Sequence, residues 1–237
     1  YTWWLGVNNT VPPLDNVKVR QALNLAIDRE NLAKLTGGKG VPLWAIYPST
    51  APGFQPDYKP YTYDPADARA KLSEAGVTDL QLELLIVGDD PLEVTMAQAI
   101  QQDLAQVGIR VDIKAVADTT VYELMVAGDT EIFLNSWYMI QPDPADLINN
   151  LYMTGAGSNY DFYSNPRVDE LAMQALSEQD RGRRLQLYQE IERLLMEDAV
   201  HVPLINGISF YLHSPRLKGF FSRSEYGPFL ERMWIQP

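Results

Sequence analysis

Short apolar runs alternate along the chain with longer stretches whose apolar residues recur at helical spacing. The apolar runs predict strands at residues 1–7, 80–87, 109–116 and 131–138. The helical spacing predicts helices at residues 17–35, 65–75, 91–107, 119–127, about 166–177 and about 181–198. Strands that alternate with helices are typical of βαβ units. The pattern therefore predicts an α/β lobe with a mixed, mostly parallel sheet flanked by helices.

Short polar residues mark where several of these helices begin. Asp15 or Asn16 is expected to cap the helix at 17–35, Asp64 precedes Pro65 at the next, and Asp180 precedes the last. A short polar side chain at such a position accepts hydrogen bonds from the free N–H groups of the first helical turn. The first helix is expected to end at Thr36, where Gly37 and Gly38 follow.

Residues 39–64 form a long segment with prolines at positions 42, 48, 52, 56 and 60. Proline removes a backbone donor and fixes φ, so this segment is predicted to be neither helix nor central strand. It also carries many aromatic residues, which indicates that it packs against the lobe. A loop of this length in a compact domain is usually functional or covers another element.

Composition narrows the class of function. The 237 residues carry a formal net charge of −12, and an acidic surface disfavours nucleic acid as a partner. The chain has no cysteine, which excludes disulfides and thiolate metal sites. The glycine clusters lack the spacing of a phosphate-binding loop. The sequence therefore predicts no cofactor.

Catalytic and metal-binding patterns are weak. His201 and His213 are the two histidines; they form no metal-binding pair, no G-x-S-x-G motif is present, and we expect both to be structural. Asp143 and Asp146 lie near Trp137 and could resemble the paired acids of a carbohydrate-active enzyme. Their positions in a Pro-Asp-Pro turn and at a helix start are explained by turn and capping roles. No catalytic residue is therefore assigned, and the enzyme remains the alternative from a different class.

The segment at 131–138 carries the strongest indication of ligand binding. It is predicted to end at the carboxyl edge of the sheet, where open α/β sheets place their ligands. Trp137 and Tyr138 point to opposite faces if the strand continues through them. One ring could then face a ligand while the other packs, although burial of both rings in the core fits the spacing almost as well.

Five segments in order along the chain resemble one family, the extracellular solute-binding proteins of the oligopeptide, dipeptide and nickel type (family 5). They are LGVNNTVPPLDNVKVRQALNLAIDREN, TYDPADARAKLSEAG, QAIQQDLAQVGIRVDI, YDFYSNPRVDELAMQAL and RRLQLYQEIERLLMEDAVHVPL. The resemblance implies a periplasmic-binding-protein-like (type II) fold, in which two lobes close on a solute and deliver it to the permease of an ABC importer. It also implies a periplasmic or extracellular location in a bacterium, with a lipid anchor possible in the full-length protein.

Family members are much longer, so the resemblance implies that this chain is their C-terminal lobe. Residues 1–205 are then expected to form the ligand-binding lobe. Residues 206–237 are expected to return to the N-terminal lobe, and on this lobe alone they should expose apolar residues or be partly disordered. The chain begins directly with a hydrophobic strand, which also suggests a fragment of a longer protein.

Ligand specificity is the least determined feature. Peptide-binding relatives often carry W-x-x-D-Y-P-D-P where this chain has Trp137 to Pro144, so Ile140 stands where their Asp binds the α-ammonium group of a peptide. The resemblance makes Trp137, Tyr138, Met139 and Ile140 the ligand-side candidates, with hinge-side candidates Asn8 and Asn206. Peptide is the predicted ligand, with an oligosaccharide or another solute as the alternative. Nickel is disfavoured because histidines are scarce, although family nickel sites can use a bound chelator.

Overall fold

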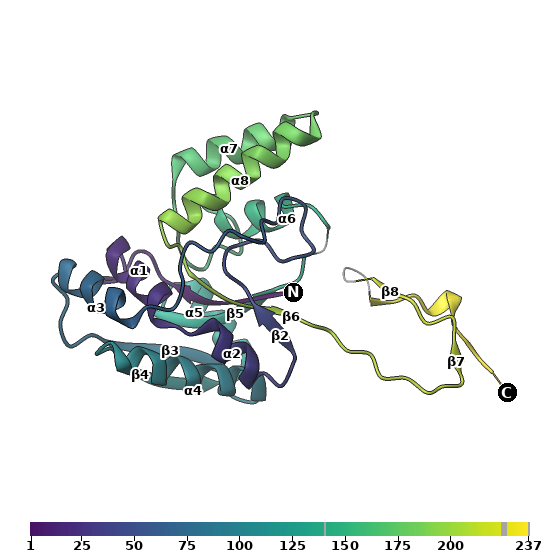
Figure 1. The fold of residues 1–237 in the computed structure, drawn as a ribbon, viewed down its shortest axis with the longest axis horizontal. Coiled ribbons are helices and arrows are strands. Elements are labelled where there is room, and N and C mark those ends of the chain that lie inside the picture. The colour runs from purple at the N-terminus through teal and green to yellow at the C-terminus, as the bar shows by residue number, and fades with distance from the viewer. Residues whose placement is uncertain (140, 224–226, 237) are drawn as a thin grey trace.

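The computed structural model describes residues 1–139, 141–223 and 227–236. Within these residues a six-stranded mixed sheet, in the order β2-β6-β1-β5-β3-β4, forms the centre of the lobe (Figure 1). The strands are β1 (Thr2–Val7), β2 (Gly40–Pro42), β3 (Gln81–Val87), β4 (Arg110–Val116), β5 (Ile132–Trp137) and β6 (Val202–Gly207). The helices are α1 (Val17–Ala26), α2 (Arg29–Leu35), α3 (Pro65–Glu74), α4 (Pro91–Gln106), α5 (Asp118–Ala127), α6 (Ala145–Leu147), α7 (Pro166–Ser177) and α8 (Arg181–Glu197), with a π-helical turn η1 (Ile148–Tyr152) after α6.

The sheet combines a parallel and an antiparallel half. Strand β3 runs parallel to both β4 and β5, as the alternation of strands and helices predicts. Strand β1 lies antiparallel between β5 and β6, and β2 is antiparallel to β6. The α/β lobe with a mixed sheet is therefore confirmed, but the sheet is not mostly parallel, since three of its five strand pairings are antiparallel. The central position of β1 follows from long-range pairing, which local alternation does not reveal.

The helix predicted at residues 17–35 is two helices, so that part of the prediction was wrong. Asp28 caps α2, and its carboxylate accepts a hydrogen bond of 2.9 Å from the backbone N–H of Asn31. Arg29, which is 1% exposed, donates from Nε to the carbonyl of Pro203 on β6 at 2.6 Å. The chain turns between α1 and α2 because the Asp28 side chain satisfies a new helix start while Arg29 is held to the sheet. At the beginning of α1, the capping residue is Asn16.

Hydrophobic clusters cover both faces of the sheet, and the two largest lie on opposite faces. Neighbouring side chains on β1 point to opposite faces, so that Leu5 belongs to one core and Trp4 to the other. The first core also includes residues of α1 to α4. The second core includes residues of η1, α7 and α8, and the latter two helices lie side by side on one side of the sheet (Figure 1).

The proline-rich segment at 39–64 packs against the second core, as its aromatic content predicts. Tyr47 is 1% exposed, and its hydroxyl donates a 2.8 Å hydrogen bond to the carbonyl of Tyr188 on α8. The backbone N–H of Tyr47 donates to the carboxyl group of Glu192, also on α8, at 2.9 Å. This loop is therefore anchored to α8, although only β2 within it is regular structure.

The residues after β6 leave the lobe and extend away from it (Figure 1). They contain two short strand pairs, β7 (Leu217–Lys218) with β10 (Trp234–Ile235) and β8 (Ser222–Arg223) with β9 (Gly227–Pro228). Their large apolar side chains are exposed, as expected for this segment: Ile208, Phe210, Tyr211, Leu212, Phe221, Leu230, Trp234 and Ile235. Among the described residues, no helix has both the length and the apolar character needed to cross a bilayer.

Candidate functional site

Three strand ends meet at one edge of the sheet. Thr2 at the start of β1 pairs with Trp137 at the end of β5 and with Asn206 near the end of β6. The backbone N–H of Gly207 also donates to the carbonyl of Tyr1 at 2.7 Å. We call this region, formed by residues 1–2, 137–139 and 206–207, the open edge. It contains four of the sequence-predicted site residues: Trp137, Tyr138, Met139 and Asn206.

Tyr138 is the most exposed of these residues. Its side chain is 55% exposed, and its ring lies 4.7 Å from the ring of Tyr1 at an interplanar angle of 30°. The ring of Tyr1 lies over Gly207, where a Cβ atom would be 2.4 Å from it. Glycine at 207 is therefore what allows Tyr1 to lie flat against the strand and support Tyr138. The two rings form an aromatic surface that a planar or apolar ligand group could contact.

Trp137 and Met139 turn toward the lobe. Both are half-buried and pack against the second core. The indole Nε1 of Trp137 donates to Oδ2 of Asp146 at 3.2 Å, which fixes the ring orientation. Trp137 thus presents only part of its ring at the edge. Ile140 lies outside the described residues.

The two acids considered for catalysis have structural partners. Asp143 is bound by the guanidinium group of Arg184 on α8, with Nη1 2.9 Å from Oδ2. Asp146 accepts the hydrogen bond from Trp137. A pair of glycosidase carboxyls must instead face the substrate from two sides. Asp143 has the predicted turn role, since its Oδ1 also accepts a 2.9 Å hydrogen bond from the backbone N–H of Ala145. Asp146 lies inside α6 and orients Trp137 instead of capping the helix.

Asn206 and Asn8, the two hinge-side candidates, lie in different places. Asn206 is half-buried at the open edge, and its Oδ1 accepts a 3.2 Å hydrogen bond from the backbone N–H of Ser49. Asn8 follows Val7, which pairs with Ile132 at the opposite end of β1, about 20 Å away at ~3.3 Å per residue. The structure therefore separates Asn8 from the other candidates.

The contacts of Asn8 give it a structural role. It is 1% exposed, and its Nδ2 donates to the carbonyls of Gly128 and Thr130. Its Oδ1 accepts from the backbone and hydroxyl of Thr10. The side chain thereby links the loop after β1 to the loop before β5. The sequence around Asn8 did not predict this structural role, because its partners Gly128 and Thr130 are 120 and 122 residues away.

The histidines also have structural surroundings. His201 is 2% exposed, with Nδ1 3.3 Å from the carboxylate of Asp161 and Nε2 3.4 Å from the hydroxyl of Tyr152. Its ring stacks on Trp4 at 5.2 Å. His213 is exposed in the segment after β6, where it stacks on Phe220 at 4.8 Å. Among the described residues, no group of three acidic, histidine or cysteine side chains is placed to hold a metal ion.

A cavity beside the open edge was not identified from the sequence. Its volume is about 80 Å³, and Asn206 is one of its lining residues. The walls come mainly from the proline-rich segment, with Glu192 contributed by α8. The density of aromatic residues in that segment is a signal for packing, but their convergence on one cavity depends on how the loop folds onto α8.

Comparison with known proteins places these features in a family. The model described as "Bacterial extracellular solute-binding proteins, family 5 Middle" matches residues 1–159. The glutathione-binding protein GsiB of Escherichia coli (strain K12) is 30% identical over an alignment of 235 positions that covers 94% of this chain and 46% of GsiB. The chain spans about half the length of the curated relatives that it matches.

Solved structures share the fold. The Escherichia coli murein tripeptide binding protein MppA matches 99% of this chain and 48% of its own, with a TM-score of 0.90 and 25% identity. The periplasmic binding protein DppA from Helicobacter pylori, in complex with the peptide STSA, matches 100% of this chain and 47% of its own. Its TM-score is 0.89 and its identity 24%. The lobe therefore has the fold of one part of longer binding proteins.

Proposed function

Because this chain belongs to the bacterial extracellular solute-binding proteins of family 5, we propose that it is the lobe with which a longer protein captures peptides for an ABC importer. The family assignment confirms the resemblance drawn from the sequence motifs. It also confirms the expectation of a binding protein rather than an enzyme, since the family is one of transport proteins. Peptide capture, the second lobe and the permease belong to the proposal.

The observation that carries the proposal is the arrangement of the open edge. The chain enters β1 and leaves β6 at adjacent positions, as Gly207 N–H bonds to the Tyr1 carbonyl at 2.7 Å. Tyr138 presents an exposed ring at this same edge. A second lobe connected through both crossings would close over these rings. A solute held between the lobes would favour the closed form by its contacts with both.

The long segment after β6 supports a return to another lobe. Phe210 is 71% exposed and Leu212 is 103% exposed, and a segment that exposes so many large apolar side chains is typical of an interaction site. The proposal assigns residues 1–205 to this lobe and residues 206–237 to contacts with the other. The location of the whole protein would then be the periplasmic or extracellular face of the membrane, as for the periplasmic relative DppA.

Relatives favour a peptide ligand. GsiB binds glutathione, MppA a murein tripeptide and DppA the peptide STSA, as their descriptions state. Position 140 is isoleucine, which cannot pair with an ammonium group, so either a peptide amine is held by another residue or the ligand has no amine at this position. The exposed Tyr138 ring also fits a stacked sugar, which keeps an oligosaccharide as the second candidate.

Thermal unfolding of the full-length protein tests the proposal. The ligands are glutathione, di- to pentapeptides, their N-acetylated forms and gluco-oligosaccharides. A peptide at about 100 times its dissociation constant should stabilise the protein by roughly 2.7 kcal/mol. A peptide effect that N-acetylation abolishes would indicate that the protein recognises the α-ammonium group through a residue other than Ile140. Stabilisation by sugars alone would overturn the peptide ligand and leave the binding-protein class intact.

A further inference from the structure

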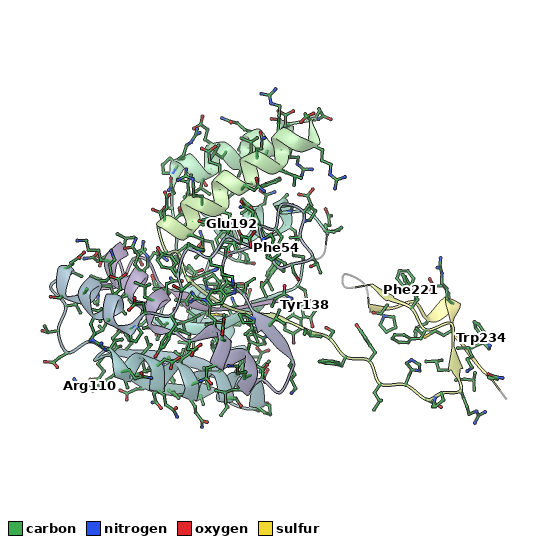
Figure 2. The ribbon with its side chains drawn as sticks, in the orientation of Figure 1. Phe54, Arg110, Tyr138, Glu192, Phe221 and Trp234 are labelled. Carbon is green, nitrogen blue, oxygen red and sulfur yellow. The ribbon has the colours of Figure 1, made fainter. Side chains whose placement is uncertain are left out.

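The cavity of about 80 Å³ beside the open edge has walls of mixed chemistry. Most are apolar or aromatic, and the principal ones are Pro42, Trp44, Phe54, Pro56 and Tyr58, with the carboxyl group of Glu192. Figure 2 shows Glu192 and Phe54 close together between α8 and the proline-rich segment, with Tyr138 at the side facing the extended tail. Since an apolar cavity of ~150 Å³ binds benzene, a cavity of about 80 Å³ has room for roughly half as many carbon atoms, the size of a small branched side chain.

The cavity lies on the same face and at the same edge as Trp137. Asn206, which lines the cavity, pairs with Thr2, and Thr2 pairs with Trp137. Directly paired residues on neighbouring strands present their side chains on one face, about 5 Å apart. Asn206 and Trp137 are therefore separated by roughly 10 Å. An extended peptide spans that length in about three residues, at ~3.3 Å each.

The carboxyl group of Glu192 fixes the wall of the cavity. Its Oε1 accepts a 2.9 Å hydrogen bond from the backbone N–H of Tyr47, and its Oε2 accepts one of 3.3 Å from the side-chain amide of Gln55. These bonds hold two separate points of the loop to α8. The side chain is only 2% exposed. The hydrogen bonds of Glu192 are thus used by the loop, and the surface left for an occupant is mostly apolar.

We propose that this cavity is a side-chain subsite that accepts a branched aliphatic side chain of valine or leucine size from a peptide bound along the open edge. The proposal rests on the proposed peptide-binding function and specifies its selectivity. The occupant is a side chain because the cavity is too small for a whole peptide unit with its flanking residues. Apolar walls favour an aliphatic group, since each buried methylene gains free energy on leaving water.

The experiment measures affinities of the full-length protein for a set of tripeptides by titration calorimetry. Alanine, valine, leucine, phenylalanine or lysine is placed in turn at each position of trialanine. At one position, leucine or valine should bind roughly 10–50-fold more tightly than alanine. Phenylalanine should gain less because the cavity is too small for its ring. A preference for lysine would overturn the proposal in favour of a cation site at Glu192.

Two variants connect that selectivity to the cavity. Ser49 is exposed and lines the cavity, so Ser49→Phe should fill it and reduce the leucine preference to under threefold. Thr50→Phe, at the exposed neighbouring position that does not line the cavity, is the matched control and should retain the preference. Phe54, 38% exposed, forms part of the wall, so Phe54→Ala should enlarge the cavity and shift the preference toward phenylalanine.

The possible failures are distinguishable. If no peptide binds the wild-type protein, the proposed function and the subsite both fall. If peptides bind but leucine gains nothing over alanine, only the subsite falls. The same holds if Ser49→Phe and Thr50→Phe, both folded by circular dichroism, retain equal selectivity.

Discussion

Arg184 on α8 binds Asp143 through both of its terminal nitrogens, with Nη1 2.9 Å from Oδ2 and Nη2 3.0 Å from Oδ1. Arg184 also donates to the carbonyl of Ala175 at 3.1 Å. A parallel pair of this kind is stronger and more directional than a single ion contact. It connects the Pro-Asp-Pro turn that follows the open edge to the helix pair α7–α8, and it leads to the first prediction.

Asp143→Asn should lower the free energy of unfolding by about 1 kcal/mol, because the pair is only one-third exposed and loses its charge. Ligand affinity should fall several-fold as the turn after Met139 loosens. Chemical denaturation and titration of the full-length protein measure both changes. Glu170→Gln removes the more exposed pair with Arg167 and serves as control. Equal losses in the two variants would contradict the positioning role of Asp143.

Tyr138→Ala should weaken ligand binding by tenfold or more while leaving stability nearly unchanged, because the side chain is 55% exposed at the open edge. Tyr122→Ala is a matched control. Tyr122 is 56% exposed on α5, and its ring also has an aromatic neighbour, Tyr160, which it meets edge-on at 6.1 Å. Calorimetric titration measures the ligand affinity of both variants. Similar affinities would remove Tyr138 from the proposed site.

Gly6→Ala should destabilise the lobe by about 1–3 kcal/mol, because a Cβ there would lie 2.3 Å from the buried ring of Phe133. Gly6 on β1 is directly paired with Phe133 on β5. The Phe133 ring lies over the β1 backbone at Gly6, in the space that a side chain would otherwise fill. Phe133→Leu in the same chain should recover part of the loss. Gly157→Ala, where the added atom meets nothing within 4 Å, should be nearly neutral in denaturant unfolding.

Glu93→Gln should stabilise the lobe at alkaline pH and have little effect in acid. Burial raises the pKa of Glu93 from 4.5 to about 7, so its favourable contribution is complete below pH 4.5 and is lost as the pH rises through 7. The neutral amide avoids the buried charge and keeps an acceptor for the N–H of Val87, now 2.8 Å from Oε2. The gain at pH 8 should be on the order of 2 kcal/mol, because solvent screens part of the buried charge.

The measurement for Glu93→Gln is the free energy of unfolding between pH 4.5 and pH 8. Glu30→Gln removes one charge from an exposed position on α2 and controls for the change in net charge. A gain of the same size at pH 4.5 as at pH 8 would show that the effect does not come from ionisation of Glu93.

Leu212→Asp should destabilise the full-length protein by about 2 kcal/mol if residues 206–237 pack on a second lobe. On this lobe alone its side chain is 103% exposed, so a structure limited to this lobe gives no reason for any loss. Leu35→Asp, at a half-exposed position near the end of α2, is the control. No difference between the two variants would count against the proposed division of the chain.

Local chemistry accounts for most of the elements that the sequence predicts. Asp64 accepts from the N–H groups of Ala66 and Asp67, and Asp180 accepts from that of Arg183, so these helices begin where their caps predict. The helix at 17–35 divides at Asp28 because Arg29 bonds to the carbonyl of Pro203. These two residues are 174 positions apart in the sequence, so a local pattern does not reveal their contact. Pattern alone follows the apolar spacing across Asp28 and joins the two helices.

The candidate site likewise has a part that the sequence predicts and a part that depends on long-range contacts. The sequence motifs identified the family, and the end of the predicted strand at 131–138 located Trp137, Tyr138 and Met139, because strand ends and side-chain alternation follow from residues close in sequence. Tertiary structure decided that β1 lies between β5 and β6, which brings Tyr1 and Asn206 to Tyr138 and places Asn8 at the far end. It also decided that the proline-rich loop closes a cavity against Glu192. Strand order and loop packing are set by contacts between residues that are distant in the sequence. The pattern of apolar and polar positions along the chain does not predict which distant residues make contact.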